Sequence, residues 1–211
     1  MCGRFYIKPN ETFSSYWETI DNGPILKMFA ESVTRPLIRE GEVSPSDLAC
    51  VIARSKAGTR SYYPMQWGFT TTRTTLVINS RVETAAKSNI FADSWRHRRC
   101  IIPCSWYFEW EHLTDEFTQT TKTGTKYALQ PRGSDITYMA GLYRFEPKGK
   151  DGRKLPVFTI LTRPASENIS QIHDRMPLIF PEELIDRWLD PAEDPGDLLI
   201  ESVYDIVAEP A

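Results

Sequence analysis

A cysteine occupies position 2, within Met1-Cys2-Gly3-Arg4-Phe5, in a chain that has only four cysteines among 211 residues. Aminopeptidases remove the initiator methionine when the second residue is small, so we expect the working chain to begin at Cys2. A terminal cysteine is a 1,2-aminothiol. Its α-amine and its thiol have ordinary pKa values of about 7.7–8.0 and about 8.5, so both reach reactive forms near neutral pH. Together they can condense twice with a single aldehyde.

Glu109 is the best candidate for an acid or base. It lies on a predicted strand and is flanked by aromatic residues, in the sequence Trp106-Tyr107-Phe108-Glu109-Trp110. A carboxyl among aromatic side chains is costly to ionise, and desolvation raises its pKa towards the range useful for proton transfer. A glutamate that points to solvent at a strand edge fits the pattern equally well.

His173 and Asn79 are the other candidate catalytic residues. Of the three histidines, His97 lies in a basic run and His112 beside a predicted loop, whereas His173 precedes Asp174-Arg175-Met176-Pro177 at a predicted turn. A side chain there can face a cleft and transfer protons. Asn79 follows the predicted strand Leu76–Ile78, where its amide could orient a substrate or cap the next helix.

Residues that suit nucleic acid are also present. Arg81, Arg175 and Lys87 are suited to phosphate contacts, because a guanidinium offers paired donors to phosphate oxygens. Trp67 could stack on an unpaired base or pack in the core.

The net charge of −3 argues against a protein that coats nucleic acid indiscriminately. Residues 71–100 have six bases and two acids, a net of +4, whereas residues 181–211 have one base and ten acids, a net of −9. This indicates either a basic face in the middle of the chain or ordinary solvated charge.

Several elements must position these residues. Asn10 followed by Phe13, Tyr16, Trp17 and Ile20 predicts a helix that ends at Asn22-Gly23-Pro24. Further short helices are predicted at Val82–Lys87, Ala165–Ile172 and Pro181–Leu189, and hairpin loops at His112–Thr125, turning near Gly124, and at Glu146–Lys154. Strands are predicted at Leu48–Ala53, Ser61–Trp67, Leu76–Ile78, Cys100–Pro103, Trp106–Trp110, Lys126–Gln130, Thr137–Phe145 and Pro156–Thr162. Because helices do not regularly separate the strands, we expect a mixed or antiparallel α+β core.

Length and composition favour one globular domain over residues 1–211. The remaining cysteines, Cys50, Cys100 and Cys104, show no zinc spacing and no disulfide framework, so we expect core thiols, no metal and no cofactor. No secretory signal and no apolar run of membrane-spanning length is evident. We therefore expect a cytoplasmic monomer with no membrane contact, associated with the nucleoid when it binds DNA.

The chain resembles the SOS response-associated peptidase (SRAP) family, which processes abasic sites in DNA. The resemblance extends from Cys2 to about Leu189 and rests on the order of several motifs. These are Cys2-Gly3-Arg4-Phe5, Trp67-Gly68, Asn79-Ser80-Arg81-Val82-Glu83-Thr84, Trp106-Tyr107-Phe108-Glu109-Trp110, Ile160-Leu161-Thr162 and Ile172-His173-Asp174-Arg175-Met176-Pro177. It implies an α+β domain whose twisted, mostly antiparallel sheets curl into a barrel-like core with short flanking helices.

The resemblance also implies a function. Cys2 would crosslink to the ring-opened aldehyde of an abasic site in single-stranded DNA and form a thiazolidine that shields the lesion. Asn79, Glu109 and His173 would be its catalytic partners, and Arg4, Trp67, Arg81 and Arg175 would contact the DNA.

The sequence departs from the family pattern in two places. Glu42-Val43-Ser44-Pro45 replaces the Asn-Val-Ala-Pro common in the family, and an acid facing DNA would repel phosphate. The segment from about 190 to 211 is short and acidic.

Two other functions remain open from the sequence. Cys2 could be the nucleophile of a thiol peptidase or amidase, with its own α-amine as the base. The basic segment 71–100 and Trp67 could instead belong to a noncatalytic single-stranded DNA-binding protein, although that function leaves Cys2 without a purpose. An adduct with abasic DNA that survives denaturation would distinguish these hypotheses.

Overall fold

The computed structural model describes residues 2–32, 35–71, 76–114, 121–148 and 152–211. Two helices follow the first strand, α1 (Glu11–Asn22) and α2 (Pro24–Ser32). The side chain of Asn10 accepts a hydrogen bond from the Phe13 N–H at 2.9 Å and so caps α1. The buried face of α1 consists of Phe13, Tyr16 and Ile20. The predicted helix, its cap and its end before Pro24 are therefore confirmed.

Five strands close into a barrel at the centre of the molecule. Strand β11 pairs with both β8 and β12, and β12 runs parallel to β4, so the sheet returns to its starting strand. The barrel strands are β3 (Leu48–Arg54), β4 (Arg60–Trp67), β8 (Arg99–Cys104), β11 (Thr137–Lys148) and β12 (Arg153–Pro164). Two short strands, β7 (Asn79–Arg81) and β13 (Arg175–Pro177), add to β12 beyond the barrel. This closure leaves few unpaired edges.

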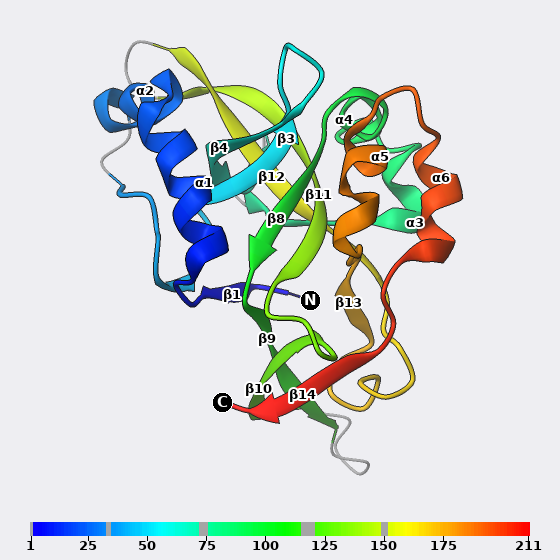
Figure 1. Cartoon of the computed structure of the whole chain (residues 1–211). Helices are drawn as coiled ribbons and strands as arrows, with labels where there is room; N and C mark the ends of the chain where they lie inside the picture. The colour runs from blue at the N-terminus through cyan, green and yellow to red at the C-terminus, as the bar shows by residue number, and fades with distance from the viewer. Residues whose placement is uncertain (1, 33–34, 72–75, 115–120, 149–151) are drawn as a thin grey trace.

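A five-stranded antiparallel sheet lies against one end of the barrel (Figure 1). Its order is β14 (Ile206–Pro210), β10 (Thr121–Pro131), β9 (Trp106–Thr114), β1 (Arg4–Ile7) and β2 (Gly41–Val43). The first strand of the chain thus has a neighbour on each side. A small third sheet pairs β5 (Phe69–Thr70) with β6 (Leu76–Val77). The N-terminal segment is therefore held inside the structure and does not trail from it.

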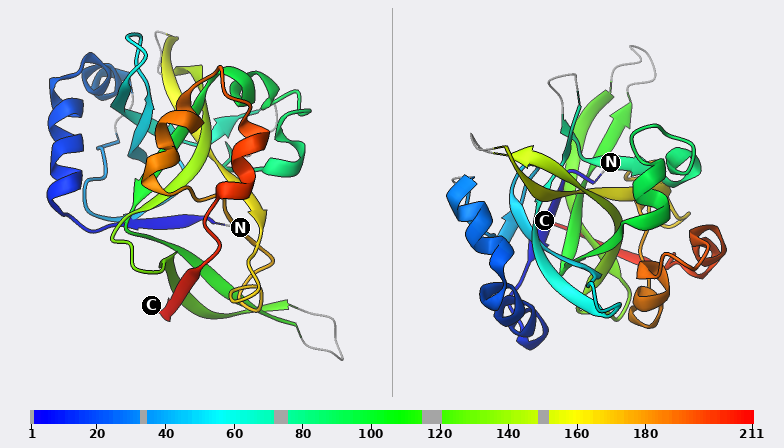
Figure 2. Two further views of the ribbon diagram at one scale, coloured as in Figure 1. Left: turned by 45° about the vertical axis from the view of Figure 1, so that its right-hand side comes forward. Right: turned by 90° about the horizontal axis from the view of Figure 1, so that it is seen from above.

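Short helices cover the side of the barrel opposite to α1 and α2 (Figure 2). They are α3 (Val82–Ala85), α4 (Ala92–His97), α5 (Ile185–Leu189) and α6 (Pro195–Leu198), with 3₁₀ turns at Glu182–Leu184 and Leu199–Glu201. Arg99 is buried, and its guanidinium donates hydrogen bonds to the main-chain carbonyls of Trp188 at 2.6 Å and Glu193 at 3.1 Å. This arginine therefore anchors the C-terminal segment to β8 and is not part of a basic surface, which corrects the expected role of part of residues 71–100.

The α+β class, the mostly antiparallel sheets, the barrel-like core and the flanking helices are confirmed. All four cysteines are buried and free, as expected for Cys50, Cys100 and Cys104. Within the described ranges, no helix is long and apolar enough to cross a membrane.

Two local predictions are wrong. Residues 165–172 form a series of turns, with Ile172 N–H bonded to the carbonyl of Ile169, in place of the predicted helix. Gly124 lies within β10 beside a register shift between Thr123 and Lys126, and so is not the hairpin turn. The tips of both predicted hairpin loops, at 115–120 and 149–151, lie outside the described residues, and the strands extend further into these segments than expected.

Gly141 tests the packing of the barrel. It lies on β11 opposite Cys100 on β8 and Ile160 on β12. A Cβ at this position would come within 2.5 Å of Ile102 Cδ1 and 2.7 Å of the carbonyl oxygen of Thr159. We expect Gly141→Ala to lower the free energy of unfolding by about 1–3 kcal/mol, the usual cost of overpacking.

Urea denaturation measures this change. Gly133→Asn is the matched control, because Gly133 has a φ of +72°, which asparagine tolerates, and nothing lies within 4 Å of an added Cβ. A Gly141→Ala variant as stable as the wild type would show that the barrel is loosely packed at this point.

Candidate active site

The main chain at Cys2 is held from the barrel side by β7. The Asn79 side-chain amide donates a hydrogen bond to the carbonyl of Cys2 at 2.9 Å, and the Cys2 thiol contacts the carbonyl of Arg4 at 3.6 Å. Cys2 is completely buried. Burial raises the pKa of the Cys2 thiol, and the negative charge of Glu109 raises it further. The thiol therefore keeps its proton at neutral pH unless a base removes it.

Trp67 positions Asn79 and does not face solvent. Its ring is completely buried and stacks on Phe158, with ring centroids 6.0 Å apart, and it also contacts Phe5 at 5.2 Å. Its indole N–H donates to the carbonyl of Ile78 at 3.0 Å, directly before Asn79. A ring covered in this way has no face available to a base. The predicted stacking of Trp67 on DNA is therefore corrected to a core role.

Asn79 is not a helix cap. Helix α3 has Arg81 at its N-cap position, with no side-chain capping hydrogen bond. The Asn79 carbonyl Oδ1 is buried and has no hydrogen-bond partner among the described residues. It can therefore accept a hydrogen bond from a group that enters the site.

Glu109 is buried, so it lies among apolar side chains and does not point to solvent at a strand edge. It shares one face of β9 with Tyr107, because side chains alternate along a strand, while Trp106, Phe108 and Trp110 occupy the opposite face. Burial raises the pKa of Glu109 to about 7, and the charge of Asp174 acts in the same direction. Such a carboxyl can both donate and accept a proton near neutral pH.

His173 is buried and electrically neutral at physiological pH. Burial lowers the pKa of His173 to about 4, although the nearby Asp174 carboxylate opposes this shift. That carboxylate lies 2.8 Å from Nδ1, but its side chain is 83% exposed to solvent. Nδ1 accepts a hydrogen bond from the Arg175 main-chain N–H at 2.9 Å. The Arg175 N–H favours the neutral tautomer with its proton on Nε2, whereas the Asp174 carboxylate favours a proton on Nδ1.

Main-chain contacts bring these side chains into one region. The His112 N–H donates to the carbonyl of Ile172 at 3.3 Å, and the His112 and His173 rings lie 4.6 Å apart, which joins β9 to the turn before β13. The pairing of Arg4 with Phe108 takes the residues ahead of β1 past Glu109. The structure thus gathers Cys2, Asn79, Glu109 and His173 from four separate segments.

Tyr107 is a residue that the sequence analysis did not select. It is completely buried, and its hydroxyl has no hydrogen-bond partner among the described residues. Burial raises the pKa of the Tyr107 hydroxyl, and the charges of Cys2 and Glu109 raise it further. The available signal was the period of two along the strand, which places Tyr107 on the same face as Glu109.

The predicted DNA-contacting arginines differ in their availability. Arg81 is exposed and forms no ion pair within the described residues. Arg175 is only 11% exposed, and it binds both carboxylate oxygens of Glu83 at 2.6 and 3.0 Å and the Thr162 carbonyl at 2.7 Å. The hydrogen bond from Arg175 lowers the pKa of Glu83. Arg81 is therefore ready to bind a phosphate, whereas Arg175 must first exchange a partner.

Glu42 does not present a bare negative charge beside the site. It forms ion pairs with Arg4 and with Lys126, the latter at 2.8 Å. Burial opposes ionisation of Glu42, but the hydrogen bonds from Lys126 and Arg4 prevail and lower its pKa. The expected repulsion of phosphate by Glu42 is thus offset by two cations. The ion pair with Glu42 also leaves less of the Arg4 charge available for DNA.

In the part of the chain that is described, no three His, Cys, Asp or Glu side chains are placed to hold a metal.

The fold and the site together define a class of protein. Its N-terminal segment is inserted into an antiparallel sheet, beside a buried carboxyl and a neutral imidazole, at the end of a closed barrel. Residues 1–208 match the family model described as SOS response associated peptidase (SRAP), and the chain belongs to this family.

Named relatives agree with this assignment, and a solved structure shares the fold. Over 205 residues, covering 94% of this chain and 86% of the relative, the sequence is 29% identical to the abasic site processing protein YobE of Bacillus subtilis. It is 33% identical to the abasic site processing protein YedK of Escherichia coli over 114 residues, 54% of this chain and 47% of YedK. A solved protein from Bacteroides thetaiotaomicron has the same fold, with a TM-score of 0.73 and 17% identity over 99% of this chain and 91% of its own.

The buried carboxyl leads to a prediction about stability and pH. The folded-state pKa of Glu109, about 7, exceeds its ordinary value of 4.5, so the folded protein keeps a proton that the unfolded chain releases between these pH values. The contribution of Glu109 to the free energy of unfolding therefore falls as pH rises from 4.5 to 7. We expect Glu109→Gln to match the wild type below pH 4.5 and to be more stable by about 3 kcal/mol above pH 7.

Urea denaturation of both proteins at several pH values gives this difference directly. His173 has the opposite dependence, because its lowered pKa makes stability fall as pH drops below 6.5, but it contributes equally to both proteins and cancels. Glu18→Gln, on the exposed face of α1, is the control. A difference that does not change with pH would show that Glu109 has the same pKa in the folded and the unfolded protein.

Proposed function

We propose that this protein processes abasic sites in single-stranded DNA by forming a covalent thiazolidine crosslink through Cys2 after Met1 is removed. The observation that carries the proposal is the placement of Cys2, bound by Asn79, beside a buried carboxyl whose pKa is about 7. The similarity to relatives named abasic site processing proteins supports it.

The first step is the formation of a Schiff base. An abasic site in its ring-opened form has an aldehyde at C1′, and the neutral α-amine of Cys2 attacks this carbon. The carbonyl oxygen leaves as water after it receives one proton from the amine nitrogen and one from the protonated Glu109, which leaves a protonated imine and an ionised Glu109. Asn79 Oδ1, which lacks a partner among the described residues, can accept a hydrogen bond from the attacking amine.

The second step closes the ring. The Cys2 sulfur bonds to the carbon of the protonated imine, and the C=N π electrons move to the nitrogen, which keeps its proton. The thiol proton passes to Glu109, and the product is a neutral five-membered thiazolidine. Because burial keeps the thiol protonated, a base must take its proton, and Glu109 is ionised after the first step. His173 can donate a hydrogen bond from Nε2. The product has no imine to promote β-elimination, so the strand remains intact and the lesion is shielded.

The DNA would be held by a small number of cations. Arg81 offers a free guanidinium, whereas Arg4 and Arg175 would each share their charge with a carboxylate. A negative net charge and few available cations favour weak, salt-sensitive binding to a flexible single strand, which can bring an unpaired sugar into a narrow site.

The alternative functions predict different products. A thiol peptidase or amidase needs an ionised nucleophile, and burial of Cys2 opposes ionisation. A noncatalytic DNA-binding protein would not need Cys2, Asn79 and Glu109 together. Neither alternative would give a covalent adduct with abasic DNA.

Single-turnover adduct formation on an abasic oligonucleotide tests the proposal. The wild-type adduct should survive denaturation, and its mass should show the loss of Met1 and of one water. Cys2→Ala keeps a terminal amine but cannot close the ring, so it should be trapped only by borohydride and should nick the strand slowly. Glu109→Gln should form the stable adduct about 10²- to 10⁴-fold more slowly, because the acid–base group is lost.

A denaturing gel with and without borohydride separates these outcomes, and Glu18→Gln serves as the control for loss of a carboxylate. A heat-stable adduct from Cys2→Ala without borohydride would exclude the thiol as the closing group. An unchanged rate in Glu109→Gln would assign that residue to structure.

Arg81 leads to a separate prediction about binding. For single strands, the slope of log affinity against log salt is about −0.7 for each neutralised phosphate. We expect a wild-type slope of about −2 to −4, and Arg81→Ala should reduce its magnitude by about 0.7. The measurement is fluorescence anisotropy with an oligonucleotide at several salt concentrations. Arg187→Ala, which removes an exposed arginine on α5, is the control. An unchanged slope in Arg81→Ala would remove Arg81 from the interface.

A further inference from the structure

The five-stranded sheet has an outer face with an unusual row of aromatic rings. Tyr6 on β1 stacks on Trp106 on β9, with centroids 4.7 Å apart and an interplanar angle of 3°. Lys126 on β10 places its Nζ 3.6 Å from the centre of the Phe108 ring and 5.5 Å from that of Trp110. Arg4 lies opposite Phe108, so this face begins next to the candidate active site.

A slot opens on the other side of Trp106. Tyr6 covers one face of the indole, and β10 lies on the far side of β9. There, a pocket of about 150 Å³ is lined by Trp106, Ala128, Gln130, Val207 and Glu209. The small side chain of Ala128 leaves the space, while Gln130 and Glu209 supply polar groups. The volume is well below the 300–1,000 Å³ of typical sites for drug-sized ligands, so it suits a single flat ring system.

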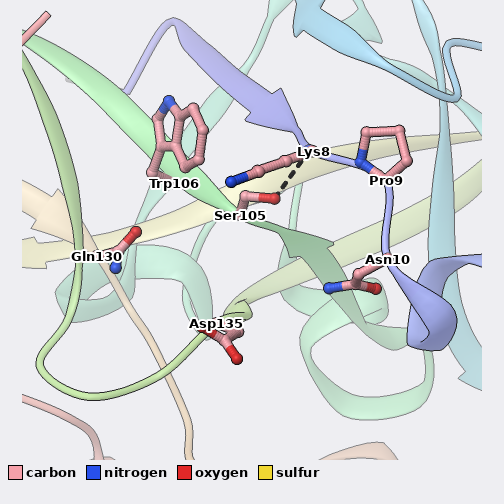
Figure 3. A pocket seen from close by; sticks show the side chains of 7 residues that line it. All are labelled: Lys8, Pro9, Asn10, Ser105, Trp106, Gln130 and Asp135. Carbon is pink, nitrogen blue, oxygen red and sulfur yellow. Dashed lines mark hydrogen bonds between the residues drawn. The ribbon is translucent and has the colours of Figure 1, made fainter.

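A second hollow adjoins the slot, because Trp106 and Gln130 line both (Figure 3). It is also lined by Lys8, Ser105 and Asp135. The Lys8 main-chain N–H donates to the Ser105 hydroxyl at 2.9 Å, which fixes the start of this loop. The Lys8 ammonium forms no ion pair within the described ranges and is exposed. A cation therefore lies beside the slot with its charge available.

These groups match the parts of one nucleotide. The indole provides a stacking surface, Gln130 and Glu209 line the pocket that a stacked ring would occupy, and Lys8 can meet a phosphate. We propose that the slot between Trp106 and Ala128 binds a nucleobase of the single strand that flanks the lesion. The proposal rests on the proposed function for the identity of the ligand as DNA.

The position of the slot agrees with this. Trp106 lies two residues along β9 from Phe108, which is opposite Arg4, and Ala128 lies on β10, two strands away from Arg4. At ordinary sheet spacings, the slot is therefore about 12 Å from Arg4. This is a separation of a few nucleotides. The stacked base would thus anchor the strand at a distance from Cys2 and help to deliver the lesion to it.

The carboxylate gives the slot a preference among bases. Glu209 can only accept hydrogen bonds when ionised, so it favours a base with an exocyclic amino group, such as the N4 amino group of cytosine. Thymine has no such group and places a carbonyl oxygen at the corresponding position. Binding of an oligo-deoxycytidine should therefore be tighter than binding of an oligo-thymidine.

Fluorescence anisotropy of the full protein with these two oligonucleotides, both without abasic sites, tests the inference. Trp106→Ala should weaken binding to oligo-deoxycytidine about fivefold or more, the loss of one stacked base. Ala128→Leu keeps the indole but fills the slot, and it should give a similar loss. Glu209→Gln should reduce the preference for cytosine. Phe145→Ala is the matched control, since this aromatic on β11 is 52% exposed and lies on the other sheet.

The outcomes separate this inference from the proposed function. The slot is not a base-binding site if both Trp106→Ala and Ala128→Leu bind DNA as tightly as the wild type. The same conclusion follows if the wild type binds the two oligonucleotides equally well. Failure of the wild type to form an adduct with abasic DNA overturns the proposed function alone, because the binding measurements use intact DNA. If one of these two variants does not fold, the other still decides, because Trp106→Ala removes the stacking ring whereas Ala128→Leu keeps it and fills the slot.

Discussion

The pairing of β1 with β9 is the constraint on which the candidate site depends. Arg4 lies opposite Phe108 and Phe5 opposite Tyr107, so the residues ahead of β1 run past Glu109. Because side chains alternate along β9, a slip of one residue would turn Glu109 to the outer face and place an aromatic ring beside Cys2. Phe5 prevents such a slip, since it is completely buried against Trp67. The register thus fixes both the inner catalytic face and the outer aromatic row.

Much of the fold could be predicted from local patterns, and the failures have a physical cause. The cap at Asn10 and the apolar spacing of α1 act within a few residues, so the sequence was sufficient there. At 165–172 the spacing of apolar residues suits a helix, but Asn168 instead donates to the carbonyl of Ile206 on β14. That contact joins residues 38 positions apart and holds the turns against β14. Contacts between distant segments outweigh local propensity here, and no local pattern encodes them.

The site shows the same division. The residue types at Cys2, Glu109 and His173 were informative because each is a reactive group within an apolar frame. The roles of the neighbouring residues could not be predicted in this way, because they depend on partners far away in the chain. The sequence left Trp67 open to either stacking on DNA or packing in the core, and its burial and its hydrogen bond to the carbonyl of Ile78 place it in the core. Glu42 is neutralised by Lys126, 84 positions away. Sequence spacing cannot show which charges will meet when the separation is this large.

Burial shifts the two ionisable groups of the site in opposite directions, and this makes them compatible with an amine nucleophile. Glu109 keeps its proton up to about pH 7 and His173 releases its own above about pH 4, so both are neutral between these values. Burial disfavours the charged form of an amine and so favours the neutral form, which is the form that attacks a carbonyl. In the proposed reaction the carboxyl would then lose its proton only when an oxygen leaves, and regain one from the thiol. The burial that makes Glu109 costly to the folded state near neutral pH is thus the same feature that suits it to transfer a proton there.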